Sequence, residues 1–196
     1  MASLVLAGDT SGSITVSAPA VSGSNTQTLV ATTGTLAPIV SGTAVASTSG
    51  TSIDFTGIPS WVRRVTVVLS EVSTSGTSGV RLQLGDSGGI ETTGYSSSGG
   101  WAGPSSSATF STSGFDASGD SGATISRSGS FVFSLLSSTS NTWTLQGMFT
   151  AGSAAGNFVF LLTGGKTLSA TLDRVRITTV NGTDTFDAGT INILYE

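Results

Sequence analysis

Apolar and polar residues alternate along much of the chain after residue 52. In "VRLQL" (80–84), valine and leucine alternate with arginine and glutamine, and "RVRITT" (174–179) repeats the same period of two. This period is typical of a β-strand with one buried face, whereas no stretch shows the 3.6-residue period of a helix. Further strand-like stretches lie at residues 61–70, 131–136, 142–149, 157–162 and 191–196. The pattern therefore predicts an all-β chain.

Strands of this kind over about 140 residues predict an antiparallel β-sandwich with a jelly-roll-like topology. The alternating apolar residues are the predicted core: Trp61, Val65, Val67, Leu69, Val80, Leu82, Leu84, Phe131, Phe133, Leu135, Trp143, Leu145, Phe149, Val175, Ile177, Ile191, Ile193 and Tyr195. "NFVFLL" (157–162) is apolar on both faces, as expected of a central strand. Residues 86–125, mostly glycine and serine, are predicted to form long surface loops with one strand near Ala108–Ser111.

The first 53 residues differ from the rest, because they contain one charged residue, Asp9, and no aromatic residue. Short strand-like pieces at Leu4–Leu6, Ile14–Ser17 and Thr28–Ala31 are separated by turn residues. Their leucines and isoleucines are too sparse to form an independent core. We therefore predict three parts: an extended β-rich segment that packs against copies of itself or a partner (1–39), a linker of small residues (40–52), and the sandwich domain (53–196).

Composition narrows the classes of function. The net charge is −4 with only seven basic residues, which argues against nucleic acid as a partner because binding phosphates needs clustered Lys and Arg. The chain has no cysteine and no histidine, so we expect no disulfide framework, no thiolate zinc site and no cofactor. No apolar run approaches the length of a membrane span, and the N-terminus lacks the features of a signal peptide. We expect no membrane insertion.

The stretch "LGDSGG" (84–89) matches the serine loop of trypsin-like proteases and, more loosely, the esterase pattern G-x-S-x-G. A nucleophilic serine needs a base, which in those enzymes is an imidazole, and this chain has no histidine. A Ser–Lys dyad would have to use Lys166, and no local pattern links that residue to Ser87. We predict a glycine-rich turn after strand 80–84, and no catalytic residue.

Other motifs are also better explained by turns and strands. "TGGKT" (163–167) ends like a phosphate-binding loop, but Phe160 stands where that motif needs glycine. Asp116 and Asp120 lie in "FDASGDSG" (115–122), which lacks the terminal bidentate acid of a calcium loop. We predict a solvated loop there and no metal site. The glycosylation triplet at Asn181 coincides with the dipeptide Asn-Gly, for which we predict a hairpin turn.

Tyr95 and Trp101 are the candidate binding residues, because each is a large aromatic residue in a stretch of serine and glycine. A rigid aromatic surface suits contact with a glycan or a protein partner. The alternative is that both rings fold back and close one end of the sandwich. No pair of the eleven acidic residues is singled out as a glycosidase pair by its spacing.

Three stretches resemble bacteriophage virion proteins. Residues 3–36, with "GDTSGSITVSAPAVSGSNTQTL", resemble a segment near the N-terminus of many such proteins, tail-fibre-like ones especially. Residues 50–95 and "FDAGTINILYE" (186–196) resemble the globular domain often joined to it, so that the resemblance covers a little under half of the chain. It implies a non-enzymatic structural protein, a homotrimer assembled in the host cytoplasm and exposed on the virion.

On this resemblance, the first expectation is a tail fibre or tail-associated component. Its N-terminal segment would bind other virion proteins, and its outward domain is a candidate for contact with a host surface glycan. A head-fibre or decoration (cement) protein on the capsid is the alternative. A carbohydrate-binding adhesin module is a further alternative, and a hydrolase that uses Ser87 is the least supported.

Overall fold

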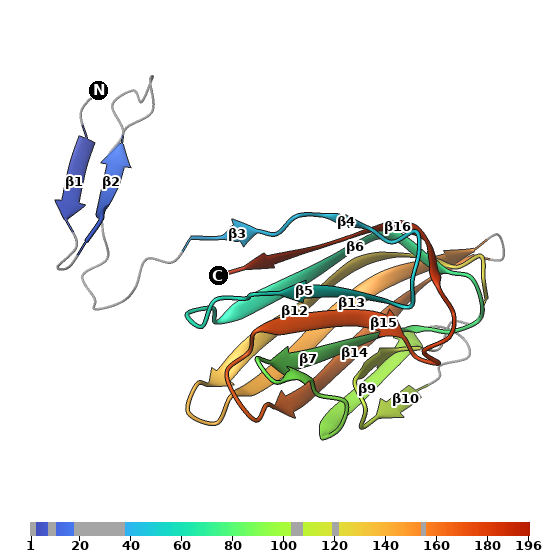
Figure 1. Cartoon of the computed structure of the whole chain (residues 1–196). Helices are drawn as coiled ribbons and strands as arrows, with labels where there is room; N and C mark the ends of the chain where they lie inside the picture. Colours follow the sequence, from blue (N-terminus) through green and yellow to red (C-terminus); the bar gives the residue numbers. More distant parts are fainter. Residues whose placement is uncertain (1–2, 8–10, 18–37, 103–107, 119–121, 154–155) are drawn as a thin grey trace. The chain divides into compact units, whose positions relative to one another are not determined.

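A computed structural model describes residues 3–7, 11–17, 38–102, 108–118, 122–153 and 156–196 (Figure 1). The chain divides into two compact units, Met1–Leu36 and Ala37–Glu196. The regular structure of the described residues is entirely β-strand, which confirms the all-β prediction. In this described part, no helix has the length and apolar character needed to span a membrane.

The described part of the first unit is a single β-hairpin. Strands β1 (Ser3–Ala7) and β2 (Ser13–Ser17) pair antiparallel, with Leu6 opposite Ile14. These strands confirm two of the predicted pieces, and the third, Thr28–Ala31, lies outside the described residues. Every side chain of β2 is exposed, so the hairpin has no core of its own.

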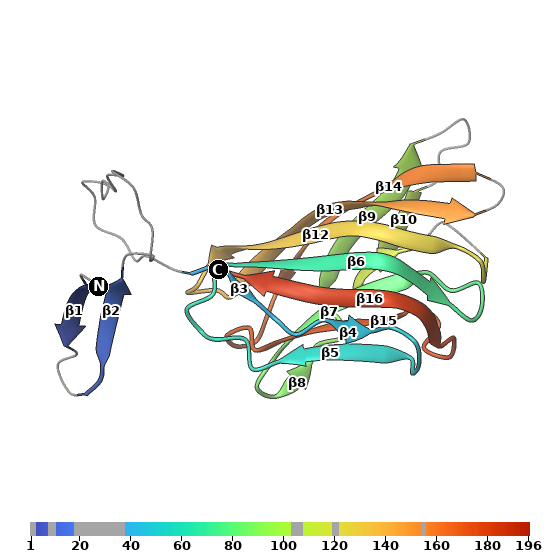
Figure 2. The same cartoon turned by 90° about the horizontal axis from the view of Figure 1, so that it is seen from above.

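The second unit is an antiparallel β-sandwich whose two sheets face each other (Figures 1 and 2). The described strands of the larger sheet have the order β10-β9-β14-β13-β12-β6-β16-β3, and β4 also pairs with β16. The smaller sheet has the order β11-β7-β15-β5, and β8 pairs with β7. These nine and five strands differ from an eight-stranded jelly roll, so that detail of the prediction is not confirmed.

The bounds of the strands show how far each one extends. The larger sheet contains β3 (Val40–Ser41), β4 (Val45–Ala46), β6 (Arg64–Thr74), β9 (Tyr95–Ala102), β10 (Ala108–Ser111), β12 (Ser126–Ser137), β13 (Thr142–Ser153), β14 (Gly156–Thr167) and β16 (Phe186–Tyr195). The smaller sheet contains β5 (Ser52–Thr56), β7 (Val80–Asp86), β8 (Gly89–Ile90), β11 (Phe115–Ala117) and β15 (Arg174–Thr179). The long strands β12, β13 and β14 form an antiparallel meander in the larger sheet.

The core between the sheets contains most of the alternating residues that the sequence predicts. The members that are fully buried are Val65, Val67, Val80, Leu82, Leu84, Phe131, Phe133, Val175, Ile177 and Ile191. Aromatic rings connect the two layers, because Phe115 of the smaller sheet contacts both Tyr95 and Phe133 of the larger one at 5.0 and 5.6 Å between centroids. Trp61 is an exception: it precedes β6, remains 40% exposed and packs on Tyr195.

Residues 40–52 are not a linker, which corrects the predicted domain boundary. Strands β3 and β4 pair with β16 along the edge of the larger sheet. The Gly42 and Ser47 backbone N–H groups donate to the Ile193 and Gly189 carbonyls, and the Ser47 hydroxyl donates to the Ala188 carbonyl. The segment of small residues therefore covers an edge that would otherwise leave backbone groups unpaired.

The predicted long loop at 86–125 is also corrected, because this region supplies β8, β9, β10 and β11. The predicted strand Ala108–Ser111 is confirmed as β10. Glycine explains how serine-rich β9 fits beside β14: a Cβ atom on Gly99 would lie 2.7 Å from the Phe160 ring. The missing side chain lets that aromatic ring pack directly on the backbone.

The sandwich begins and ends at the same pole. Val40, where β3 starts, is opposite Tyr195, where β16 ends. Figure 1 shows the C-terminus beside β3 at this end. We call it the entry pole, defined by Val40 and Tyr195. The chain therefore enters the sandwich at the entry pole, where β16 also ends.

Candidate functional site

The protease-like motif is a tight turn, as the sequence predicts. Strands β7 and β8 pair through Asp86 and Gly89, and the exposed Ser87 and Gly88 connect them. The Asp86 Oδ1 atom accepts a 2.7 Å hydrogen bond from the Gly88 N–H group. Gly89 has φ +136°, a conformation that L-residues rarely adopt. The turn therefore accounts for Gly89 by its conformation, and Gly85 is accounted for by close packing, because a Cβ atom there would overlap the Gly89 carbonyl oxygen.

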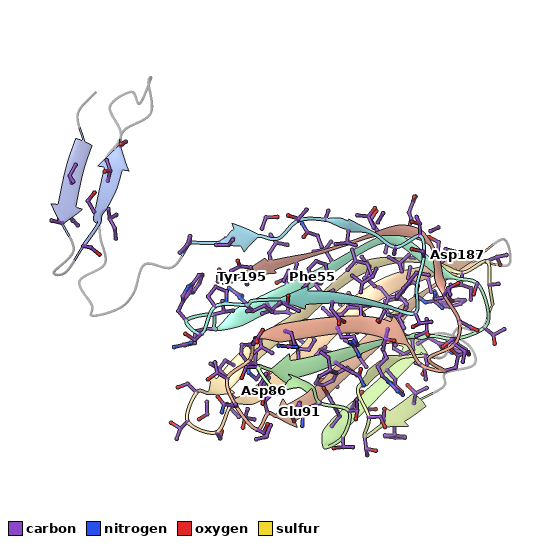
Figure 3. The ribbon with its side chains drawn as sticks, in the orientation of Figure 1. Phe55, Asp86, Glu91, Asp187 and Tyr195 are labelled. Atoms are coloured by element: carbon purple, nitrogen blue, oxygen red, sulfur yellow. The ribbon has the colours of Figure 1, made fainter. Side chains whose placement is uncertain are left out.

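Lys166 binds a carboxylate rather than Ser87. Its side chain points inward from β14, and Nζ lies 2.5 Å from Glu91 Oε2 and 5.2 Å from the centre of the Tyr95 ring. The Ser169 N–H and hydroxyl groups lie 2.7 and 2.9 Å from Glu91 Oε1. The same hydroxyl lies 2.7 Å from Asp86 Oδ2, and Figure 3 shows Asp86 and Glu91 near each other.

These contacts set the protonation of both carboxyl groups. The hydrogen bonds from Ser169 and from the Gly88 N–H lower the pKa of Asp86 below its ordinary value. Burial acts to raise the pKa of Glu91, but the hydrogen bonds from Lys166 and Ser169 outweigh it and lower that pKa. Both groups are therefore ionised at neutral pH. The network joins the end of the smaller sheet to the larger sheet.

Sequence reasoning missed this network, and Ser169 in particular. Its members come from four separate positions between 86 and 169, so no local spacing signals them. A serine between two carboxylates has no imidazole to activate it, since the chain has no histidine. Within the described residues, no group of three or more Asp or Glu side chains forms a metal-ligand set.

The other motifs lie in ordinary secondary structure. "TGGKT" (163–167) is the last part of β14, in extended conformation. Asp116 is not in a solvated loop, which corrects the prediction: it is buried in β11 and forms a bidentate pair with Arg81 at 2.6 and 2.8 Å. Asp120 lies outside the described residues. Asn181 lies in a turn, with its side-chain oxygen accepting hydrogen bonds from the N–H groups of residues 183 and 184. This turn is not the predicted hairpin, because it connects β15 of the smaller sheet to β16 of the larger one.

The two candidate aromatic residues occupy different environments. Tyr95 is buried in β9, where its hydroxyl accepts a hydrogen bond from the Leu84 N–H and donates to the Glu91 carbonyl. Burial raises the pKa of Tyr95. Its ring therefore packs in the interior and offers no surface to a ligand. Trp101 is half-buried, lies 5.4 Å from the Phe158 ring and borders a hollow on the outer face of the larger sheet.

This outer hollow is a site that sequence reasoning did not find. It has a volume of about 910 Å³. Its lining comes from β9, β10, β12, β13 and β14: Ser98, Gly99, Gly100, Trp101, Ala108, Ser130, Val132, Gln146, Gly147, Met148, Leu161, Leu162 and Thr163. The apolar stretch 157–162 predicts a central strand, and β14 does lie between β9 and β13. Its outward-facing residues Val159 and Leu161 are nevertheless 43% and 48% exposed.

Comparisons with known proteins assign the chain to no group. No family model matches it, and neither does a curated protein or a solved structure. The hairpin, the entry pole and the outer hollow are the structural features that bear on the function of the chain.

Proposed function

We propose that this chain is a non-enzymatic structural protein of a bacteriophage virion, a homotrimer attached through residues 1–36. The sandwich is then the outward domain of a tail fibre or tail-associated component. The resemblance of the three sequence stretches supports the virion, and the hairpin supports association. This proposal assigns the two units different tasks, attachment for the first and display for the second.

The carrying observation is the aliphatic face of the hairpin. Leu6 and Ile14 are opposite each other, and Val16 follows on the same side of β2. Their side chains are 54%, 69% and 59% exposed. A lone two-stranded hairpin is at best marginally stable in water. This face therefore needs another apolar surface, and copies of the same hairpin provide one without bringing charges into the contact.

The entry pole supports the outward role of the sandwich. Since β3 begins at that pole, attachment through the N-terminal segment would hold the sandwich there. A domain held at one pole can present the other to the medium. No step of this role needs a catalytic residue.

Sedimentation of the full chain tests the association. We expect the wild type to sediment as a trimer, and the double variant Leu6→Asp/Ile14→Asp to sediment as a monomer with unchanged near-UV circular dichroism. Leu136→Asp is the control, because Leu136 is 72% exposed on β12 and should leave the trimer intact. A monomeric wild type would contradict the proposed association.

Particle composition tests the virion role separately. Mass spectrometry of gradient-purified phage particles should detect the chain, and immunogold labelling should place it on the tail. Labelling on the capsid would instead support the decoration protein, and absence from intact particles would rule out both.

A further inference from the structure

The outer face of β9, β10, β12, β13 and β14 carries no charge among the described residues. The charged residues of these strands are Arg127 and Lys166, and both are buried. An uncharged face offers an ionic ligand no counter-charge. A neutral ligand, in contrast, can bind there without displacing water from any charged group.

Small residues of β9 form the floor of the outer hollow in this face. Ser98 and Gly100 line it and are opposite Thr163 and Leu161 of β14 respectively. Phe110 of β10 is not a lining residue, but it is opposite Ser98 and 81% exposed, so its ring lies beside the hollow on the same face. The hollow has a volume of about 910 Å³, which is in the range of small-molecule sites.

Neutral hydrogen-bonding groups line this hollow. The side chains of Ser98, Ser130 and Gln146 make no hydrogen bond to another residue of the described ranges. The two hydroxyls and the amide can each donate and accept. A second copy of the sheet packed on this face would bury these groups, and each one not aligned with a partner on the copy would be unfavourable. A ligand that carries its own hydroxyls would satisfy them.

We propose that the outer hollow binds a neutral oligosaccharide. Its hydroxyls exchange hydrogen bonds with Gln146, Ser98 and Ser130, and an apolar face of one sugar ring packs on the exposed Phe110 ring. The proposal names a ligand chemistry for the outward domain. It extends the proposed function, but binding by the purified full chain does not depend on where a particle carries it.

A glycan array tests the ligand class. The probes are neutral hexose and N-acetylhexosamine oligosaccharides, with sialylated and uronic acid oligosaccharides beside them. We expect neutral probes alone to bind, with an affinity that does not change between low and high salt, because no charge takes part. Binding of no neutral probe, or of acidic probes only, would overturn the proposal.

Paired variants test the location by calorimetry with the best neutral probe. Ser98→Leu should fill the floor and weaken binding by about tenfold or more, equivalent to the loss of one buried hydrogen bond. Ser134→Leu is the matched control, because Ser134 is also half-buried on this face but lies outside the hollow. Equal affinities of the two variants would overturn the assignment.

A second variant and its control test the location even if Ser98→Leu does not fold. Phe110→Ser should weaken binding without loss of fold, since the Phe110 ring is exposed, whereas Leu136→Ser should bind as the wild type does.

The competing occupant of the outer hollow is a second copy of the chain. Self-association of the wild type that Phe110→Ser and Ser98→Leu abolish, without glycan binding, would replace the proposal with that contact. Particle composition is measured independently, so failure of glycan binding and failure of the virion role are distinguishable.

Discussion

The hairpin and the sandwich use the same alternation of apolar and polar residues, but their apolar faces differ in what they contact. Ile177 of β15 is completely buried between two sheets, whereas Ile14 of β2 is 69% exposed. The sandwich completes its core within one chain. The hairpin has formed its backbone pairs without a core.

This difference separates strand formation from burial. A hairpin register can be set by local pairing and turn residues, but its stability depends on an apolar surface outside the hairpin. The free energy of unfolding of the sandwich should therefore not depend on protein concentration. The order of the hairpin should depend on it, because association stabilises the bound form by mass action.

The strongest test exchanges isoleucine for alanine in each region. Ile177→Ala should lower the free energy of unfolding of the sandwich by about 2–5 kcal/mol, because it removes a buried side chain and leaves a cavity. Ile14→Ala should leave that free energy unchanged and lower the association constant. Urea denaturation and sedimentation equilibrium measure the two effects. Similar losses of sandwich stability in both variants would abolish the distinction between the regions.

Ion pairs provide the next test of how far the sandwich depends on its interior. Lys166→Met leaves the Glu91 carboxylate without its cation in a mostly buried site, and should cost about 1–3 kcal/mol. Arg64→Met breaks the Arg64–Glu196 pair, whose arginine side chain is 53% exposed, and should cost about 0–1 kcal/mol. Chemical denaturation measures the free energy of unfolding of both variants and so compares the two costs. An equal cost would show that burial does not control the strength of these pairs.

Sequence predicts the strands of the sandwich in which apolar and polar side chains alternate. It does not predict those in which glycine and serine interrupt this alternation. The period of two in 80–84 and 174–179 predicts β7 and β15. The sequence of β9 predicts loops instead, because clusters of serine and glycine are typical of them. The position of β9 depends on the Phe160 ring of β14, which packs on Gly99.

The candidate sites were harder to predict, because most of them depend on contacts between residues that are far apart in sequence. The turn at Ser87 is local, so its residues were sufficient to predict it. The environments of Tyr95 and Lys166 depend on Glu91 and on strands far away in sequence. The outer hollow is defined by five strands together, and the apolar residues on its walls look like core residues in the sequence.

The turn gives a smaller effect that should also be confined to the sandwich. Gly89→Ala should cost about 1–2 kcal/mol, because alanine does not readily adopt φ +136°. Gly88→Ala should cost less, since the φ of Gly88 is not positive and its Cβ would approach only the Asp86 side chain. Thermal unfolding measures both, and the trimer should persist in each variant. A larger loss in Gly88→Ala would contradict this account of the turn.

Acid gives the smallest expected difference, and it should act on the sandwich alone, because the described strands of the hairpin contain no ionisable side chain. The folded-state pKa of Asp86 lies below its unfolded value. Its contribution to stability is therefore fully present above the unfolded pKa of about 4, and is lost as the pH falls through the folded pKa. Ser169→Ala removes the main cause of the shift. The variant should be less stable at neutral pH and should approach the wild type below about pH 4.

Urea midpoints measured from neutral pH to about pH 3 would show whether the two stability curves converge in this way. Ser96→Ala is the control, because Ser96 is exposed on β9 and bonds to no carboxylate among the described residues. Its curve should run parallel to that of the wild type. If Ser169→Ala also runs parallel, its hydroxyl does not set the pKa of Asp86. The association constant of the hairpin should not change over the pH range in which the sandwich remains folded, because the aliphatic side chains of the hairpin face do not titrate.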